Sequence, residues 1–428
     1  MSSNNEILAI HGGPKTINKT FKTHNPIGRR EVRAVKKVMK SGVLSKFLGT
    51  WHENFYGGPK VLEFEKECVR FFEVKHAISV NSWTSGLITA VGAIGLEPGD
   101  EVIVSPWTMS ASAMAIVHWG GIPVFADIDP KTFCITPESI ISRITPRTKA
   151  IMSVDIFGSS ADADGIMKVA AEHNLKVISD TAQAPGANFE GKKAGTSTNI
   201  GGISLNYHKH IHTGEGGVLF TDDDELAVRM QLIRNHAESV VGGMKYEKLN
   251  NMVGYNFRMG EIEAAIGIEQ LQKLNSIITR KQQLANQLTK ELQSLPGLQT
   301  PDIQMDLQHV YYVYPMVIDP NVLEISREKL VDALRKEGVP SLVEGYVNLH
   351  RLPMFQKKIA FGSLGFPWTL HDKNLQPDYS LGTCPVAEEL HDKTYLAFAI
   401  TGLDLAEKDI TLIGKAFRKV WSNLASLK

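Results

Sequence analysis

Residues 204–217 read Ser-Leu-Asn-Tyr-His-Lys-His-Ile-His-Thr-Gly-Glu-Gly-Gly and lead into the apolar run Val218-Leu219-Phe220. This tract places Lys209 among bulky neighbours, ahead of a glycine turn whose backbone can approach a ligand without interference from Cβ atoms. A lysine amine has an ordinary pKa of about 10.4 and becomes a useful nucleophile when it is desolvated or lies beside other cations. The tract is therefore compatible with a Schiff-base lysine, with Ser204 available for an anion. The alternative is a solvated surface lysine, which is the commoner situation.

The composition narrows the class of partner. The chain has 428 residues, and its 46 Lys and Arg are balanced by 46 Asp and Glu. This balance predicts no attraction to nucleic acid or to an anionic membrane, and favours a small-molecule partner. The length predicts two domains, or one large domain with an appendage. Cys68, Cys134 and Cys384 lie far apart, which indicates buried thiols rather than a disulfide framework or a zinc site.

Targeting and membrane signals are not visible in the sequence. The amino-terminal residues are polar, without the basic start and apolar core of a signal peptide. No apolar run reaches the roughly 18 residues that a membrane span requires. We therefore expect a cytoplasmic enzyme without a membrane partner.

Short apolar strands alternate with helical segments through the first half of the chain. Strands are predicted at 77–80, 101–104, 123–127, 148–155 and 175–180, and helices at 29–39, 61–72, 110–119 and 163–173. This alternation predicts an α/β fold with a mostly parallel sheet covered on both faces, and a ligand site beyond the carboxyl ends of the strands. Trp107, Asp180 and Lys209 lie near such ends, so we expect them to converge.

Two segments near strand ends suit a charged ligand. Thr84 and Ser85 lie at a helix start, where free N–H groups and the helix dipole favour an anion. Ordinary N-capping by Ser82 or Thr84 is a compatible alternative. Asp180 lies in an apolar run and needs a cation or several donors, because an isolated buried charge is costly. A protonated pyridine nitrogen would supply that cation, whereas capping of the next turn is the alternative.

The carboxyl-terminal third has a different pattern. A helix at 260–274 and a long helix at 277–295 connect to a strand-like tract at 309–318 and to helices at 327–337 and 407–421. We predict an amino-terminal arm at 1–28, a large domain at 29–275 and a small carboxyl-terminal domain at 276–428.

The ordered set of motifs resembles a known family. The motifs are Thr84-Ser85, Trp107, Asp180-Thr-Ala-Gln183, Ser204-x4-Lys209, Thr213-Gly-Glu-Gly-Gly217 and Gly254-Tyr-Asn-Phe-Arg258. Across roughly residues 25–425 the chain resembles the sugar aminotransferases of the DegT/DnrJ/EryC1/StrS family. The resemblance implies an aspartate-aminotransferase-like α/β structure of fold type I. Such a structure has a large domain with a mostly parallel central sheet flanked by helices and a smaller C-terminal α+β domain, and its cofactor is pyridoxal 5'-phosphate (PLP).

The resemblance also implies how the cofactor ring is held. Lys209 matches the lysine that forms the aldimine with PLP, and Asp180 matches the carboxylate that pairs with the pyridine nitrogen. Gln183 matches the side chain near the ring oxygen, and Trp107 matches the aromatic residue that stacks on the ring.

The phosphate contacts follow from the same resemblance. Thr84, Ser85 and Ser204 match phosphate-binding positions, and Asn256 matches an asparagine that reaches the phosphate from the neighbouring subunit. The last match implies a homodimer with shared active sites. The chain departs from the family at Trp83, where Asn-Gly-Thr is usual and Ser-Trp-Thr is present, and we expect Trp83 to narrow the pocket.

The reaction implied by the resemblance is a ping-pong transamination. An amino acid, expected to be L-glutamate, would give its amino group to the cofactor, which would then aminate a keto group of a sugar. The Thr-Gly-Glu-Gly-Gly motif resembles enzymes that act on 4-keto nucleotide sugars. The arm at 8–15 and the chain length resemble a branch that aminates keto-cyclitols of the scyllo-inosose type with L-glutamine.

Two other functions remain as alternatives. One branch of the family replaces the lysine with histidine and acts as a PLP-dependent sugar dehydratase, which the presence of Lys209 argues against although His208 and His210 flank it. The alternative from a different class is a non-catalytic, regulatory PLP-binding protein.

The substrate contacts are the least specific part of the sequence. We predict contacts from Tyr56, His210, Glu344, Tyr346 and His350, each of which could instead be structural. The aromatic, glycine-rich segment 50–59 suits either a polyhydroxylated ligand or a dimer contact.

Two groups of ionisable residues are further candidates for binding sites. Basic residues at Arg351 and at 357–358 suit either a nucleotide diphosphate or a solvated turn. Alternating histidines at 208, 210 and 212 suit polar lining or packing rather than metal binding.

Overall fold

The core of the molecule is a seven-stranded sheet. The computed structural model describes residues 6–302 and 307–428. The strands of the sheet are β2 (His76–Val80), β3 (Glu101–Val104), β4 (Ile122–Phe125), β5 (Thr148–Val154), β6 (Lys176–Asp180), β9 (Ile200–Ser204) and β10 (Gly217–Thr221). Their order is β2-β10-β9-β6-β5-β3-β4, and β10 is antiparallel to both of its neighbours whereas the other pairs are parallel. This mostly parallel α/β sheet confirms the predicted fold class.

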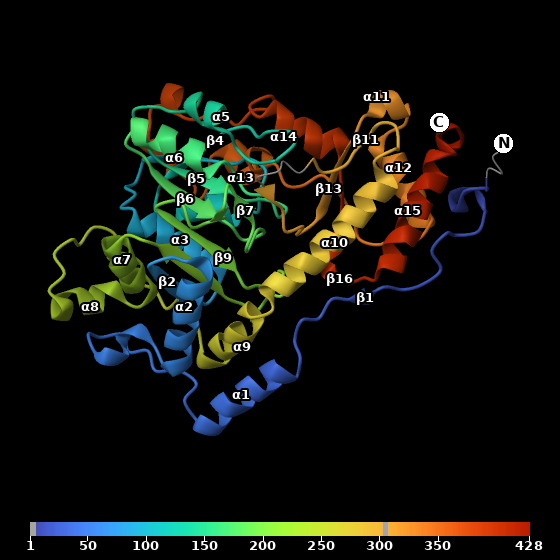
Figure 1. Ribbon diagram of the computed structural model, residues 1–428. Coiled ribbons are helices and arrows are strands. Elements are labelled where there is room, and N and C mark those ends of the chain that lie inside the picture. The colour runs from blue at the N-terminus through green and yellow to red at the C-terminus, as the bar shows by residue number, and fades with distance from the viewer. Residues whose placement is uncertain (1–5, 303–306) are drawn as a thin grey trace.

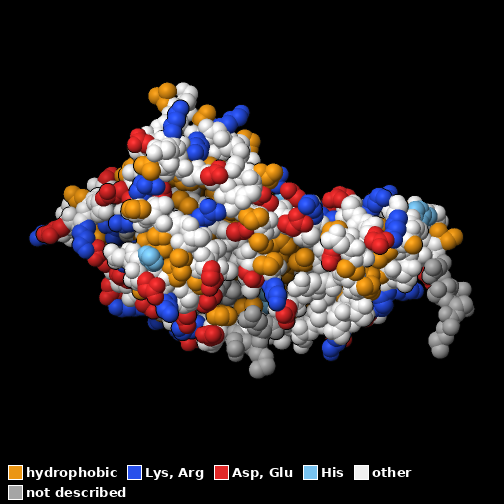
Figure 2. All heavy atoms as spheres, turned by 90° about the horizontal axis from the view of Figure 1, so that it is seen from above, with side chains coloured by type: hydrophobic (Ala, Val, Ile, Leu, Met, Phe, Trp, Pro, Cys, Tyr) orange, Lys and Arg blue, Asp and Glu red, His pale blue; other side chains and the backbone are white. Residues whose placement is uncertain are grey.

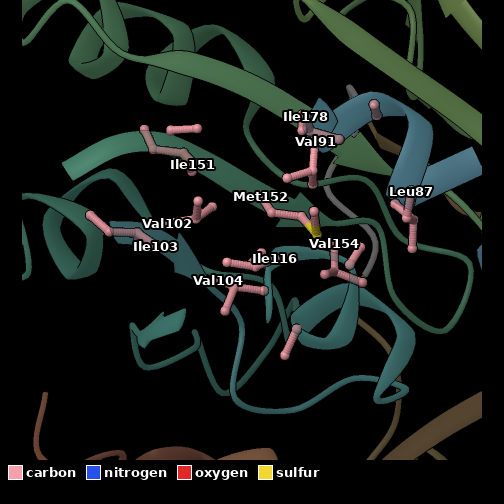
Figure 3. Close-up of a cluster of buried hydrophobic side chains, with 14 of the residues drawn as sticks. Leu87, Val91, Val102, Ile103, Val104, Ile116, Ile151, Met152, Val154 and Ile178 are labelled. Atoms are coloured by element: carbon pink, nitrogen blue, oxygen red, sulfur yellow. The ribbon is translucent and has the colours of Figure 1, made fainter. Parts of the chain in front are cut away.

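Helices cover both faces of the sheet (Figure 1). They are α2 (Pro59–Phe72), α3 (Trp83–Ala93), α4 (Ala111–His118), α5 (Pro137–Ile141), α6 (Ala163–Glu172), α7 (Asp224–Arg234), α8 (Ala237–Met244) and α9 (Glu261–Leu271). Successive residues of β10 point to opposite faces, because side chains alternate along a strand. Leu219 joins the hydrophobic cluster that holds Leu87 of α3, whereas Val218 and Phe220 join the cluster that holds Phe64 of α2. Figure 3 shows the α3 side of this core, where helix side chains meet those of β3, β5 and β6.

A second, antiparallel sheet of order β11-β13-β15-β14 lies in the carboxyl-terminal part. Its strands are β11 (Leu298–Gln299), β13 (Tyr314–Ile318), β14 (Leu342–Glu344) and β15 (Tyr395–Phe398). The accompanying helices are α10 (Leu274–Leu292), α11 (Pro320–Leu323), α12 (Arg327–Lys336), α13 (Pro353–Lys357), α14 (Pro385–Glu389) and α15 (Glu407–Trp421). The long helix α10 runs from the region of α9 toward α12 and α15 (Figure 1). A three-stranded sheet of β12 (Leu307–Gln308), β7 (Asn188–Phe189) and β8 (Lys192–Lys193) contains strands from both halves of the chain.

The predicted strand at 309–318 begins later than the pattern suggests. The N–H of Val310 donates to the carbonyl of Gly158 (2.8 Å), and the N–H of Val313 donates to the carbonyl of Phe157 (3.3 Å). Tyr311, between them, has a positive φ of 54°. These hydrogen bonds draw residues 310–313 to a loop of the central sheet, so β13 starts only at Tyr314.

The segment between β14 and β15 packs on the central sheet rather than on the smaller one. The hydroxyl of Tyr379 donates to the carbonyl of Pro123 in β4 (2.6 Å), and Nε1 of Trp368 donates to the Tyr379 oxygen (2.9 Å). Phe355 and Trp368 are part of the same hydrophobic cluster as β3 and β5. The predicted domain boundary near residue 275 stays a prediction. This segment follows that boundary in the sequence, but it packs on the central sheet, which precedes the boundary.

The amino-terminal arm reaches across to the carboxyl-terminal part. Ahead of α1 (Arg29–Ser41), the arm forms the short strand β1 (Lys22–Thr23), which pairs with β16 (Leu403–Asp404). Leu8 and Ile17 lie in the hydrophobic cluster formed by α10, α12 and α15. The arm is also held by polar groups, because the buried Glu337 carboxylate accepts from the N–H of Ala9 (2.8 Å) and of Thr16 (2.9 Å) and pairs with Lys419 (3.0 Å).

The surface carries both signs of charge. Acidic and basic side chains are interspersed over the face shown in Figure 2, in line with the equal numbers of the two kinds in the sequence. Of the helices in the described ranges, none combines the length and the apolar composition that crossing a bilayer would require.

The anchoring of the arm can be tested at Glu337. We expect Glu337→Ala to destabilise the protein by about 3–5 kcal/mol, because it leaves the buried Lys419 ammonium without its partner. The arm should also be released, so that trypsin cleaves faster after the exposed Lys22. Urea denaturation and the rate of cleavage measure the two effects. Glu389→Ala removes one partner of the exposed pair with Lys393 and should leave both measurements unchanged, since exposed pairs add little to stability. Equal behaviour of the two variants would contradict this view of the arm.

Candidate active site

The loop that follows β9 positions Lys209. The N–H of Leu205 donates to the carbonyl of Gly216 (2.9 Å), and the N–H of Thr213 donates to the carbonyl of Leu205 (3.0 Å), so the loop closes on itself at the base of β9 and β10. Gly216 has a φ of 154°, in the region that favours glycine. A turn from Asn206 to Lys209, whose N–H donates to the Asn206 carbonyl (3.0 Å), directs the lysine from this loop.

Lys209 is a buried amine. Its side chain lies over the ring of Tyr312, with Nζ 4.7 Å from the ring centroid, and the residue is 9% exposed. Burial lowers the pKa of Lys209 from 10.5 to about 8, and the charge of Asp180 opposes part of that shift. Within the described residues, no oxygen accepts a hydrogen bond from its Nζ. The amine is therefore free to react at near-neutral pH.

Asp180 lies at the end of β6 and is 4% exposed. Its Oδ1 accepts hydrogen bonds from Nε1 of Trp83 (2.7 Å) and from the N–H of Ala182 (3.2 Å). Its Oδ2 accepts from the hydroxyl of Ser112 (2.7 Å). Three donors stabilise the carboxylate, which meets the requirement that a buried charge be hydrogen-bonded.

Gln183 is fixed by two hydrogen bonds. Its Oε1 accepts from the N–H of Phe157 (3.0 Å), and its Nε2 donates to the hydroxyl of Tyr346 (3.2 Å). These bonds set the orientation of the amide and join the loop after β6 to the loop after β14. Burial raises the pKa of Tyr346, so its hydroxyl stays protonated at neutral pH.

One pocket of about 180 Å³ joins these groups. Its lining consists of Ser82, Trp83, Thr84, Thr108, Met109, Ala111, Val154, Asp180, Ala182, Gln183, Ser204, Asn206, His208, Lys209, Glu215, Tyr312 and Tyr346. Asp180 and Lys209, which are distant in sequence, thus face a common cavity.

Two hydroxyl-bearing residues of the lining, Ser82 and Thr84, lie at the start of one helix. Ser82 is the N-cap of the eleven-residue helix α3, and its oxygen accepts from the N–H of Ser85 (3.1 Å). Thr84 and Ser204 line the pocket as well. Ser85 is buried and is not in the lining; its hydroxyl lies 2.8 Å from that of Ser82. A helix start with free N–H groups and hydroxyls is suited to a phosphate.

The residues of this pocket fit PLP. A neutral-capable amine can bind its aldehyde, a buried carboxylate can pair with its protonated ring nitrogen, and the hydroxyls at the start of α3 can hold its phosphate. The amine, Lys209, has no competing acceptor, and the carboxylate, Asp180, has no cationic side chain bonded to it among the described residues. Both groups therefore have capacity left for a ligand.

The structure does not place Trp107 where ring stacking requires it. Trp107 is 0% exposed and is not in the lining. It packs edge-on against Phe157 (5.4 Å between centroids), Tyr395 (4.9 Å) and Tyr346 (6.2 Å) behind the pocket. The prediction that Trp107 stacks on the ring is therefore corrected, because Trp107 does not reach the pocket. Met109, two positions later, lines the pocket instead.

Two of the predicted substrate residues are buried in internal contacts. Nε2 of His210 lies 2.8 Å from the carbonyl of Val310, and His210 is fully buried outside the lining. Burial lowers the pKa of His210 to about 4, so the ring is neutral. Nε2 of His350 lies 2.8 Å from Oε1 of Glu388, also fully buried. These contacts do not support a substrate role for either histidine.

The other predicted substrate residues fall in different places. Tyr346 lines the pocket. Glu344 pairs with Arg335 (2.7 Å) and Tyr56 packs against Phe55 (5.2 Å between centroids), both outside the lining. Arg351 pairs with Asp392 (2.8 Å), which occupies its charge.

Asn256 is exposed and does not line the pocket of its own chain. Its Oδ1 accepts from Nε of Arg258 (2.7 Å), and its carbonyl lies 3.4 Å from Nδ2 of Asn81, close to the start of α3. The predicted contact of Asn256 with a cofactor in a neighbouring subunit stays a prediction.

Several residues of the site were not predicted from the sequence. The ring of Tyr312 lies beneath Lys209, the hydroxyl of Ser112 donates to Asp180, and Met109 lines the pocket. Ser112 and Met109 follow β3, so their place near a strand end was a usable signal. Tyr312 comes from the segment before β13, and the sequence contains no motif that marks it.

The chain is similar to a known protein family and to several of its members. The sequence profile of the DegT/DnrJ/EryC1/StrS aminotransferase family matches residues 27–375. The spore coat polysaccharide biosynthesis protein SpsC of Bacillus subtilis (strain 168) is 35% identical over 80% of this chain and 86% of its own length. L-glutamine:2-deoxy-scyllo-inosose aminotransferase of Streptoalloteichus tenebrarius is 30% identical over 98% of this chain and 99% of its own length.

A solved structure shares the fold. The crystal structure of DesI in the presence of its TDP-sugar product superposes with a TM-score of 0.79 at 26% identity, and covers 97% of this chain and 96% of that one. Together with the family match and the shared pocket of Asp180 and Lys209, this similarity confirms the resemblance seen in the sequence. The chain belongs to the DegT/DnrJ/EryC1/StrS family of PLP-dependent sugar aminotransferases.

Proposed function

We propose that this enzyme transfers an amino group from L-glutamate to the keto group of a nucleotide-linked sugar in a ping-pong reaction. The observation that carries the proposal is the shared pocket, in which the buried Lys209 amine and the buried Asp180 carboxylate line one cavity. DesI, whose structure contains a TDP-sugar product, is similar over nearly the whole chain. The motif Thr-Gly-Glu-Gly-Gly at 213–217 supports the same substrate class.

Each residue of the pocket contributes a defined task. PLP, when bound, supplies an aldehyde that reacts with amines and a ring that stabilises negative charge on the substrate carbon. Nζ of Lys209 is unprotonated in part at neutral pH, and can accept a proton from the substrate carbon and return it. Asp180 offers a fixed anion to the protonated ring nitrogen. Gln183 presents an amide of fixed orientation.

A keto-cyclitol is the second candidate substrate. The inosose aminotransferase from Streptoalloteichus tenebrarius aligns with this chain from end to end, including the arm. Its name gives L-glutamine as donor. Both substrates present a keto group among hydroxyls, so the pocket chemistry is compatible with either.

A homodimer with shared sites and a cytoplasmic location remain part of the proposal. The exposed position of Asn256 near the start of α3 supports a contact with a second copy. Large apolar side chains are also exposed on Trp51 and Val253. Such side chains suit a buried interface better than open solvent.

Replacement of the lysine tests the proposed function most directly. We expect Lys209→Ala to lower transamination by more than about a thousandfold, the scale on which loss of an essential acid–base group acts. The visible absorbance of bound PLP should also shift toward that of the free aldehyde. Lys248→Ala, at an exposed pair with Glu225, should retain both properties. Transamination that survives Lys209→Ala would rule the assignment out.

The lowered pKa of Lys209 gives a pH dependence. Only the unprotonated amine captures an aldehyde, and at a pKa of about 8 roughly one amine in ten is unprotonated at pH 7. Covalent capture of PLP by the apoprotein should rise about tenfold per pH unit below 8 and level off above it. Borohydride reduction after brief exposure, followed by mass analysis of the modified peptides, measures capture.

Lys281 is an internal control for that experiment. Burial lowers its pKa to about 8 as well, but its Nζ donates to the carbonyls of Ile400 (2.9 Å) and Leu403 (3.0 Å). We expect no modification at Lys281. A capture rate that keeps rising to pH 10 would contradict the lowered pKa of Lys209.

The two substrate classes can be separated by a half-reaction. The enzyme is first incubated with L-glutamate or L-glutamine until the absorbance of PLP is lost. A 4-keto nucleotide sugar or scyllo-inosose is then added, and we expect the nucleotide sugar to restore the absorbance faster. Faster restoration by scyllo-inosose would favour the cyclitol function. If neither donor lowers the absorbance of PLP, a regulatory PLP-binding protein would be favoured instead.

A further inference from the structure

Trp83 stands at the centre of the departure from the family motif. It is the first residue of α3, directly after the Ser82 cap, and is 6% exposed. Although Trp83 is part of the pocket lining, its indole does more than narrow the space, since Nε1 donates to Oδ1 of Asp180 at 2.7 Å. The only side-chain donors to this carboxylate in the described residues are Trp83 and Ser112.

The indole reaches Asp180 across two strands of the sheet. Trp83 follows β2, and β10 and β9 separate β2 from β6 in the strand order. Both strands carry a glycine at the crossing. A Cβ on Gly217 would lie 2.9 Å from Cα of Trp83, and a Cβ on Gly202 would lie 2.4 Å from Cη2 of the indole. Gly202 is the register partner of Asp180, so the indole lies over the residue beside the carboxylate.

A third glycine completes the seat of the indole. Gly86 lies one turn along α3, where a Cβ would come within 2.7 Å of Cε3 and 2.9 Å of Cζ3 of Trp83. These two ring atoms are the nearest to that position. A Cβ on Gly202 would also lie 2.2 Å from the carbonyl oxygen of Val218, so the strand itself requires a glycine there. At Gly86 the nearest atoms belong to the indole, so it is the indole that requires this glycine. Glycines on three elements thus leave room for Trp83: the one on β10 for its backbone, and those on β9 and α3 for its indole.

The hydrogen bonds show what the seat achieves. Oδ1 of Asp180 accepts from Trp83 and Oδ2 accepts from Ser112, both at 2.7 Å, so the two side-chain donors hold opposite oxygens. Without the indole, Oδ1 would keep only the 3.2 Å bond from the N–H of Ala182. Rotation of the carboxylate about its Cβ–Cγ bond would then be less restrained.

We propose that Trp83 is a positioning residue that holds the Asp180 carboxylate in the orientation in which it receives the protonated ring nitrogen of PLP. The proposal rests on the proposed function, because it requires that PLP bind in this pocket. Trp83 acts through Asp180, and its indole N–H is used up in that bond. The tryptophan in place of the usual glycine thereby replaces free space with a second donor to the carboxylate.

The test compares two ligands that differ at the ring nitrogen. Apoprotein is titrated with PLP and with its carbocyclic analogue, in which a C–H group replaces the ring nitrogen. Trp83→Phe should weaken binding of PLP about tenfold, which is the size expected for one hydrogen bond to a charged group. It should change binding of the analogue less than about twofold, a difference well below that of one hydrogen bond. The analogue has no ring proton for Asp180 to receive.

A second variant keeps the shape of the indole. Tryptophan 83 can be replaced by its benzothienyl isostere, in which sulfur takes the place of the N–H group, so that the glycine seat stays filled. We expect the same difference between PLP and the analogue as for Trp83→Phe. A matched control is Trp368→Phe, which removes another fully buried indole donor, bonded to Tyr379 at 2.9 Å outside the pocket. It should leave binding of both ligands unchanged.

The outcomes separate this proposal from the proposed function. Equal weakening of both ligands by the isostere would show a purely structural role and overturn the proposal. PLP binding that is unchanged by the isostere would overturn it too. If the unsubstituted chain fails to bind PLP at all, the proposed function itself fails, and that result is read without any variant.

Discussion

The burial of one amine and one carboxylate in a common cavity is the constraint on which the rest of this structure depends. Neither charge is stable in an apolar interior without compensation. Asp180 obtains it from three donors. Lys209 instead gives up part of its charge, because burial lowers its pKa to about 8. A hydrogen-bonded carboxylate and an amine with a lowered pKa are what imine chemistry with a pyridine-containing aldehyde requires.

Each part of the fold supports that arrangement. The parallel strands bring the segments after β3, β6 and β9 to one edge, and the start of α3 adds hydroxyls and free N–H groups there. Tyr312 and Tyr346 come from the carboxyl-terminal third and close the other side of the cavity. The position of Tyr312 depends on the hydrogen bonds of residues 310 and 313 to the loop at 157–158, and Tyr346 accepts a hydrogen bond from Gln183. The site therefore lies where the central sheet meets the carboxyl-terminal segments.

Glycine placement sets a further condition. Gly202 and Gly86 leave room for the Trp83 indole, and Gly217 leaves room for the Trp83 backbone beside β10. A tightly packed interior has few voids as large as an indole ring, so the side chain and the glycines around it must match in shape. This dependence connects a departure at one motif position to residues on two strands and on its own helix. It also explains why Trp83, which looked like an obstruction in the sequence, is accommodated beside the carboxylate.

The sequence by itself determined the fold class, the family and the central chemical groups. Hydrophobic periodicity gave the alternating strands and helices, because the periods of 2 and 3.6 residues are local properties of the chain. The spacing around Lys209 and Asp180 was sufficient to predict that both lie near strand ends. Local pattern could not reveal that Trp107 lies behind the pocket and Met109 in it, or that His350 is bonded to Glu388. The side-chain donors to Asp180 and the tyrosine beneath Lys209 were decided only by tertiary structure, because they depend on contacts between residues 68 to 103 positions apart, which no local pattern encodes.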